Sequence, residues 1–161
     1  MKIIGIDPGL SGGIAVLENN KVLNMFDMPV MSEGKKNKRQ LNSAQLVNLI
    51  KENINSNEDI AVIVEQVNAM PGQGVTSMFN FGQTFGAIKG VCAALELPIF
   101  FVRPAKWKKH FELINSSKDS SRTKAIEMYP KLANQLAKKK DVNKSDAILI
   151  ARFYSETRLL D

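Results

Sequence analysis

Two short apolar segments that each end in a carboxylate constrain the fold of this chain more than any other feature. Residues 2–7 (KIIGID) and 60–64 (IAVIV, followed by Glu65) are almost continuously apolar, as strands buried on both faces of a sheet are. A helix predicted between them favours a parallel crossover, which brings the carboxyl ends of the two strands to the same edge. Neighbouring parallel strands lie roughly 4.8 Å apart, so we expect Asp7 and Glu65 to reach a common cation.

The other segments follow an α/β order. Further strands are predicted over 14–18, 21–27 and 98–102. Helical periodicity occurs over 44–55, 77–95, 104–113, 121–129 and 144–158. The pair Asn19-Asn20 indicates a hairpin, Ser43 is the predicted cap of its helix, and the polar, basic stretch 29–42 is predicted to be a mobile loop. The order β-β-β-α-β-α-β-α-α-α predicts a mixed sheet in one domain spanning residues 1–161.

A stripe of glycines runs along the predicted helix 77–95. Gly82, Gly86 and Gly90 are spaced four residues apart, and each weakens a helix by about 1 kcal/mol. Such a stripe indicates close packing against a neighbour. That neighbour is either the sheet of the same domain, which we favour, or a second subunit.

A third acid, Asp146, begins an apolar helix (AILIA) that must pack on the same sheet. Clustered carboxylates repel one another unless a cation offsets their charge, and oxygen ligands suit Mg²⁺ or Mn²⁺. Two such ions about 4 Å apart can activate a water and stabilise the leaving 3′ oxygen in phosphodiester cleavage. Each acid alone is better explained as a cap, Asp7 in an Asp-Pro-Gly turn and Asp146 at a helix start. The conjunction of three acids favours a site.

Composition limits the class of protein and its compartment. With 44% hydrophobic and 24% charged residues the chain resembles an ordinary globular protein. The lone Cys92 cannot form an internal disulfide, no apolar run is long enough for a membrane span, and the first ten residues do not resemble a signal peptide. We therefore expect a cytoplasmic, nucleoid-associated protein without membrane contacts, with a phage or organellar origin left open.

The net charge of +6 makes a polyanionic partner plausible. If several basic segments converge on one face, they supply a surface that can follow a phosphate backbone. The basic residues form four clusters: Lys35, Lys36, Lys38 and Arg39; Arg103, Lys106, Lys108 and Lys109; Lys118, Arg122 and Lys124; and Lys138, Lys139 and Lys140. The first cluster alone is better explained as a solvated loop. Trp107 either stacks on a base or, as we favour, anchors its helix to the core. His110, the single histidine, is expected to be structural rather than a general base.

Five motifs in order resemble RuvC-type Holliday junction resolvases: GIDPGLSGGIAVL, VIVEQV, SMFNFGQTFGAIKGV, VRPAKWKK and KSDAILIA. They span residues 3 to about 155, and the stretch from Met70 to Lys109 is most similar to the shorter phage and bacterial branch. The resemblance implies a ribonuclease-H-like mixed sheet with helices on both faces. It also implies a homodimeric crossover junction endodeoxyribonuclease that uses Mg²⁺, with Mn²⁺ as a substitute, to nick two opposed strands of four-way DNA.

The resemblance also assigns roles to single residues. Asp7, Glu65 and Asp146 match the metal-binding acids of the family. The fourth acid matches either Asp141, which we take as the candidate, or the position that holds Asn143. Two further matches concern DNA: Lys108 matches a basic residue near the scissile phosphate, and Arg122 more loosely matches a second basic contact. Apart from these matches, we take Lys106, Lys109, Lys124 and Asn68 as candidate DNA-binding residues.

One position departs from the family pattern. Asn68 stands where the well-studied bacterial branch has an aromatic residue that stacks at the junction centre. Opening of the junction would then require another wedge, such as Met70 or Phe79, or none. The cleavage-site preference and any partner helicase stay undetermined.

Three alternative functions compete with that of a resolvase. GIDPGLSGGIAV also resembles the first phosphate loop of actin-like and sugar-kinase-like ATP-binding domains, but 161 residues leave no room for their second half. A related ribonuclease-H-like nuclease selective for other branched DNA is the second alternative. A catalytically weak junction-binding protein is the third, which the retained acids disfavour.

Overall fold

A five-stranded sheet with the strand order β3-β2-β1-β6-β7 forms the centre of the molecule. The computed structural model describes residues 1–34 and 38–158. Its sheet consists of β1 (Lys2–Asp7), β2 (Gly13–Glu18), β3 (Lys21–Asp27), β6 (Ile60–Glu65) and β7 (Ile99–Val102). The first three strands pair antiparallel, whereas β6 pairs parallel with both β1 and β7. The predicted mixed sheet, hairpin first and crossovers later, is confirmed.

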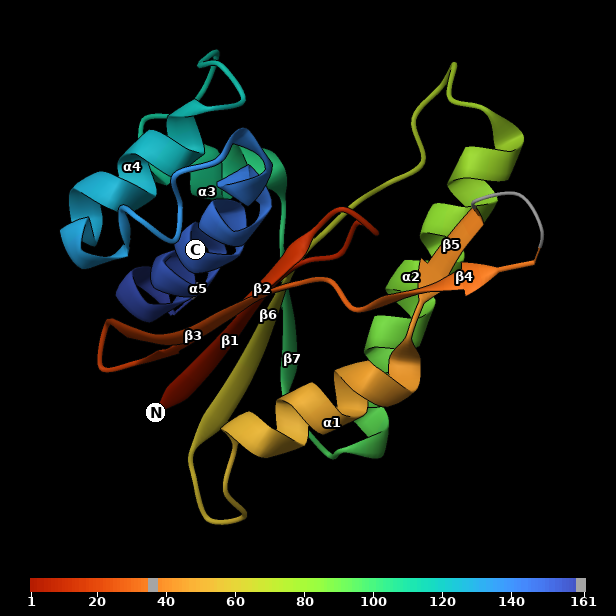
Figure 1. Ribbon diagram of the computed structural model, residues 1–161, viewed down its shortest axis with the longest axis horizontal. Coiled ribbons are helices and arrows are strands. Elements are labelled where there is room, and N and C mark those ends of the chain that lie inside the picture. Colours follow the sequence, from red (N-terminus) through yellow and green to blue (C-terminus); the bar gives the residue numbers. More distant parts are fainter. Residues whose placement is uncertain (35–37, 159–161) are drawn as a thin grey trace.

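Helices cover both faces of this sheet (Figure 1). One face carries α1 (Ser43–Asn53) and α2 (Val75–Ala94); the other carries α3 (Pro104–His110), α4 (Ser120–Met128) and α5 (Val142–Thr157). Two short 3₁₀ turns, η1 (Pro130–Leu132) and η2 (Lys139–Asp141), precede α5. Side chains alternate along β1, so Ile3 joins the core under α5 and Ile4 the core under α1 and α2. Two apolar layers thus sandwich the sheet.

Two glycines let α5 lie directly on the sheet. A methyl group at Gly5 in β1 would overlap the carbonyl oxygen of Ala147, and one at Gly13 in β2 would come within 2.7 Å of the carbonyl oxygen of Asn143. The helix axis therefore crosses β1 and β2 at closer range than side chains would allow. Asp146 lies between Asn143 and Ala147 in the sequence, so this close contact of α5 with the sheet also sets the distance between Asp146 and the end of β1.

The stretch 29–42 differs from its predicted loop. Two strands, β4 (Val30–Glu33) and β5 (Lys38–Leu41), form an antiparallel hairpin beside α2. Most of its side chains are exposed, and only the flanking Met28 and the terminal Leu41 enter the core. With so little burial the hairpin has no apolar alternation, which is the signal that strand prediction relies on. Lys35 and Lys36 lie outside the described residues.

The start of α1 also differs by one residue from the prediction. Asn42, and not Ser43, is the N-cap, and its side chain accepts a hydrogen bond of 3.0 Å from the Gln45 N–H. The hairpin at Asn19-Asn20 is confirmed, since both residues have the positive φ angles (48° and 62°) that a tight turn between β2 and β3 requires. No helix among the described residues combines the length and the apolarity that a bilayer crossing demands.

The glycine stripe on α2 does not face the sheet. A methyl group added at Gly82, Gly86 or Gly90 would meet no atom within 4 Å. The favoured interpretation, close packing against the domain's own sheet, is therefore wrong. Val75 and Phe79 near the start of the same helix are 86% and 66% exposed, so α2 has an open surface of small and apolar residues.

Candidate active site

The fold brings three acidic residues from three elements to one end of the sheet. Asp7 ends β1 and Glu65 ends β6, and the parallel register of these strands (Ile6 opposite Val64) puts the two acids next to each other. Asp146 lies five residues into α5 and reaches the same end, because α5 is seated on Gly5 and Gly13. A cluster of carboxylates at the carboxyl ends of strands is where α/β sheets hold their ligands.

Burial and mutual repulsion make these carboxylates resist ionisation. Burial, followed by the charges of Glu65 and Asp146, raises the pKa of Asp7 to about 7, against the N–H of Gly9 and the charge of Lys108. Burial likewise raises the pKa of Glu65 and that of Asp146. A cation between the three acids would remove both the repulsion and the desolvation penalty.

The chemistry of the three acids fits a divalent metal. Asp146 Oδ1 is buried without a hydrogen-bond partner, which is unusual for a charged oxygen and leaves a ligand atom available. All ligand atoms are hard carboxylate oxygens, the type that Mg²⁺ and Mn²⁺ prefer. Nowhere in residues 1–34 and 38–158 do three or more His, Cys, Asp or Glu side chains already converge closely enough to hold an ion. The three acids thus form an open set that would have to draw together around a metal.

Lys108 lies near the three acids and lines a pocket together with Asp146. It is carried by α3, a short helix that begins with Pro104 at its first position, directly after β7. Its positive charge lowers the pKa of Asp7, Glu65 and Asp146 alike, which places the ammonium within electrostatic reach of all three. The match of Lys108 to a residue near the scissile phosphate is thus compatible with its position.

Trp107 occupies the core as expected and has a second contact that sequence reasoning missed. The side chain is fully buried, and its Nε1–H donates a hydrogen bond of 2.7 Å to Glu65 Oε2. This bond opposes the rise in the pKa of Glu65. The available signal was chemical, because a buried indole N–H has to find an acceptor, and Glu65 is an acid at the end of a neighbouring strand.

A pocket of about 300 Å³ opens beside Asp146 between residues of α3, α4 and α5. Its lining is polar and basic and includes Lys108, Lys118, Ser116, Ser117, Ser121, Asn143 and Asp146. Sequence reasoning missed Ser121, whose hydroxyl lies near enough to Asp146 to lower the pKa of that carboxyl, against the effect of burial. It placed Lys118 only in a general basic cluster. Both residues precede or begin a helix in a serine-rich segment whose path no local pattern predicts.

Asp141, the candidate fourth acid, has polar partners of its own outside the set of three acids. Asp141 ends η2, is buried, and accepts hydrogen bonds from the Lys138 N–H at 2.8 Å and an ion pair from Lys144 at 3.0 Å. Although burial opposes it, these contacts hold the pKa of Asp141 below its ordinary value. Asn143, the alternative fourth position, lines the pocket together with Asp146.

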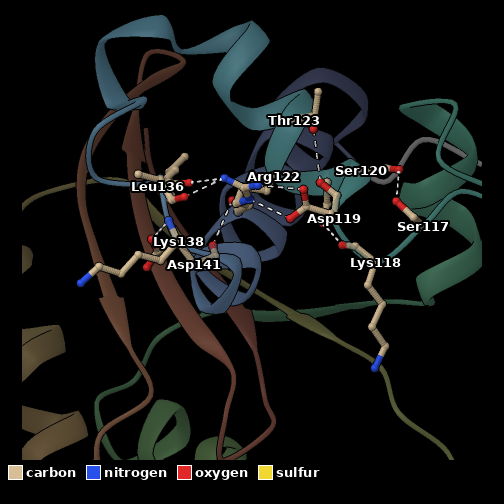
Figure 2. A network of polar contacts seen from close by, with 12 residues as sticks. Ser117, Lys118, Asp119, Ser120, Arg122, Thr123, Leu136, Lys138 and Asp141 are labelled. Carbon is tan, nitrogen blue, oxygen red and sulfur yellow. Dashed lines mark hydrogen bonds and ion pairs between the residues drawn. The ribbon is translucent and has the colours of Figure 1, made fainter.

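Arg122 is held in place by hydrogen bonds to its neighbours, as Figure 2 shows. Its Nε and Nη2 groups donate to the two carboxylate oxygens of Asp119 at 2.7 and 2.8 Å. Its Nη1 group donates to the carbonyl oxygens of Leu136 and Ala137 at 3.0 and 3.1 Å. The side chain thus ties the start of α4 to the segment before η2, and a phosphate contact would have to compete with these bonds.

The remaining candidate DNA contacts are Lys106, Lys109, Lys124 and Asn68. Lys106 and Lys109 have exposed positions on α3, and Lys124 on α4 pairs with Glu127 at 3.5 Å. Asn68 is exposed in the segment that follows β6.

Two further residues from the sequence analysis can be placed as well. Met70, one of the two alternative wedges, is 64% exposed. The prediction that His110 is structural is supported by its 2.6 Å contact with Glu156 on α5.

Comparison with known proteins identifies the family. The family model described as "Crossover junction endodeoxyribonuclease RuvC" matches residues 3–153. The chain belongs to the RuvC family. Members of this family are nucleases that depend on divalent metal ions, which accounts for three partly buried acids beside a lysine.

Solved RuvC structures share the fold. The structure described as "T. thermophilus RuvC in complex with Holliday junction substrate" aligns with a TM-score of 0.62 and 16% identity, covering 98% of this chain and 96% of that one. A second Thermus thermophilus RuvC structure aligns with a TM-score of 0.56 at the same 16% identity, over 98% and 97% of the two chains. A search of curated proteins found no match. The ribonuclease-H-like α/β fold expected from the sequence is confirmed by this similarity.

Proposed function

We propose that this chain is a Holliday junction resolvase, a crossover junction endodeoxyribonuclease that hydrolyses phosphodiester bonds of four-way DNA with the help of Mg²⁺. The observation that carries the proposal is the set of three partly buried carboxylates, Asp7, Glu65 and Asp146, beside Lys108 in a RuvC-family chain. The solved relative bound to a Holliday junction supports branched DNA as the substrate.

Asp7, Glu65 and Asp146 are the residues that would hold Mg²⁺ or Mn²⁺. A bound ion would supply charge neutralisation and an activated water for hydrolysis that leaves 5′-phosphate and 3′-hydroxyl ends. The unpaired Oδ1 atom of Asp146 supports its role as a ligand. Asn143 lines the same pocket as Asp146, which favours it over Asp141 as the fourth contact.

Lys108 offsets the negative charge that develops on the phosphate during cleavage. A cation held close to the reacting group contributes most where water is scarce, and the carboxylates around Lys108 are largely buried. The adjoining pocket, with Lys118 and the hydroxyls of Ser116, Ser117 and Ser121, has the donors that a phosphate backbone needs. Exposed Lys106 and Lys109 extend the basic surface along α3.

The proposed enzyme acts as a homodimer, because paired nicks in opposed strands need two sites related by a two-fold axis. The open surface of α2 supports a dimer interface on this helix. It carries Phe79 and Val75, both largely exposed, and a glycine stripe with free space in front of each Cα. Sedimentation of the purified chain should report a dimer at micromolar concentration, and a monomer at all concentrations would contradict this part of the proposal.

The decisive experiment compares two conservative substitutions at opposite ends of the sheet. Asp7→Asn removes one carboxylate of the site, whereas Asp59→Asn makes the same chemical change at an exposed position before β6. On a synthetic four-way junction with Mg²⁺, Asp7→Asn should abolish nicking and keep junction binding. Asp59→Asn should cleave like the wild type. Undiminished cleavage by Asp7→Asn would overturn the metal-site assignment.

The same assay separates the alternatives. Tight junction binding without nicks by the wild-type protein would favour a junction-binding protein without catalysis. Efficient nicking of flaps or forks in place of four-way DNA would favour another branched-DNA nuclease. Basic side chains that bind DNA phosphates release the counterions of those phosphates. Junction binding should therefore weaken steeply as the salt concentration rises.

A further inference from the structure

Trp107 contacts both the acidic and the basic side of the proposed site. Its indole Nε1–H donates to Glu65 Oε2 at 2.7 Å, and the Lys108 ammonium lies 5.4 Å from the centroid of its ring. The side chain is completely buried, so packing in the core holds the indole that makes both contacts in one position. The N–H at the edge of the indole ring orients the Glu65 carboxylate, and the face of the ring attracts the Lys108 ammonium.

We propose that Trp107 is a positioning residue for metal binding, which engages Oε2 of Glu65 and leaves Oε1 as the oxygen for the metal ion. This role rests on the metal-dependent function proposed above. A glutamate without such a partner samples several rotamers about its three side-chain torsions. The indole restricts Glu65 to one of them, so that its carboxylate is already in place when an ion arrives.

The open geometry of the acids makes this restriction useful. Since the three carboxylates do not converge as they stand, at least some side chains must move to enclose an ion. Glu65 is tied to the core through Trp107, whereas Asp146 Oδ1 has no hydrogen-bond partner. Glu65 is thus the fixed member of the set and Asp146 an adjustable one. Removal of such an outer partner of a metal ligand typically weakens metal affinity by 10–100-fold.

A single-atom exchange separates this role from simple core packing. Trp107 is the chain's only tryptophan, so biosynthetic replacement of tryptophan by benzothienylalanine changes this position alone. That analogue has sulfur in place of the indole N–H and keeps the size and the aromatic face of the side chain. It removes the donor to Glu65 and retains the surface under Lys108.

The control variant tests the effect of a looser core. Phe111→Leu alters a buried side chain at the end of the same helix that makes no polar contact with the acids. It should lower the thermal stability of the protein without changing metal binding. The benzothienyl protein should keep nearly wild-type stability, which urea unfolding followed by circular dichroism would check.

The measurement is Mn²⁺ binding to the full-length proteins, by calorimetry and by the electron paramagnetic resonance signal of free Mn²⁺. We expect 10–100-fold weaker binding by the benzothienyl protein and wild-type binding by Phe111→Leu. Junction cleavage should then need proportionally more Mn²⁺, with unchanged affinity for the DNA. Equal Mn²⁺ affinity in the wild-type and benzothienyl proteins would overturn the positioning role and leave the proposed nuclease function standing.

A failure of the proposed function gives a different result. In the wild-type protein, Mn²⁺ that binds at Glu65 should quench the fluorescence of Trp107, and Glu65→Gln should greatly reduce this quenching. If the wild-type protein binds no Mn²⁺, alone or with a four-way junction, the metal-dependent function and the role of Trp107 both fail.

Discussion

The cluster of partly buried acids should make the metal-free protein less stable as pH rises, and Asp7→Asn should remove most of this loss of stability. Burial and the neighbouring acids raise the pKa of Asp7 from 3.8 to about 7. Between these values the folded protein holds a proton that the unfolded chain has lost, so stability falls with pH across this window. Below pH 4 both states are protonated and above pH 7 both are ionised, so the contribution is constant outside the window.

The size of the effect follows from the width of that window. About three pKa units correspond to about 4 kcal/mol, at about 1.4 kcal/mol per unit. Asparagine has nearly the shape of a protonated aspartate and carries no charge at any pH. Asp7→Asn should therefore match the wild type near pH 4 and exceed its unfolding free energy by up to about 4 kcal/mol at pH 8.

Urea unfolding in the presence of EDTA measures this directly. From pH 5 to pH 8 the difference between Asp7→Asn and the wild type should grow by about 3 kcal/mol, which represents the two pKa units between pH 5 and 7. Saturating Mg²⁺ should reverse the order, because an ion that binds only the folded wild type stabilises it. A pH-independent difference, or a less stable Asp7→Asn protein at pH 8 without metal, would refute the electrostatic reasoning.

Three further predictions concern residues around the site. Lys108→Ala should lower the cleavage rate about 100-fold or more with little loss of junction binding. Lys109→Ala, at a proposed DNA contact, should weaken junction binding and keep the cleavage rate at saturating DNA within about twofold; equal losses of rate would contradict a specific role of Lys108. Arg122→Ala should lower the melting temperature because Asp119 and two carbonyl oxygens lose their partner, and Arg122→Lys should recover only part of it, since a lysine cannot bond both carboxylate oxygens with fixed geometry. Gly86→Ala should stabilise the folded protomer by about 1 kcal/mol and weaken the dimer in sedimentation; an unchanged dimer would exclude that part of α2 from the interface.

The sequence predicted those features of the site that depend on strand ends and helix starts. Asp7 and Glu65 were placed together because parallel strands end at the same edge, and Asp146 followed from an apolar helix that had to pack on the sheet. These arguments need only the order of elements and their handedness. The family resemblance added Lys108, which no periodicity singles out.

Features that depend on irregular segments were not predictable in this way. The hairpin β4–β5 has exposed side chains and no apolar alternation. The glycine stripe was assigned to the wrong neighbour, because spacing shows which residues share a helix face and not which face meets the sheet. Arg122 was matched by position, but its bonds to the carbonyl oxygens of Leu136 and Ala137 depend on the path of the loop between α4 and α5. Local patterns carry no information on such a path.

The products of four-way junction cleavage test the central claim most directly. The wild-type protein with Mg²⁺ should convert a synthetic junction into two nicked duplexes whose paired, symmetric nicks have 5′-phosphate and 3′-hydroxyl ends that DNA ligase reseals. Linear duplex of the same sequence should stay intact, and EDTA should abolish cleavage. Junction cleavage that persists in EDTA, or no cleavage of any four-way junction across a range of central sequences, would contradict a metal-dependent resolvase built on Asp7, Glu65 and Asp146.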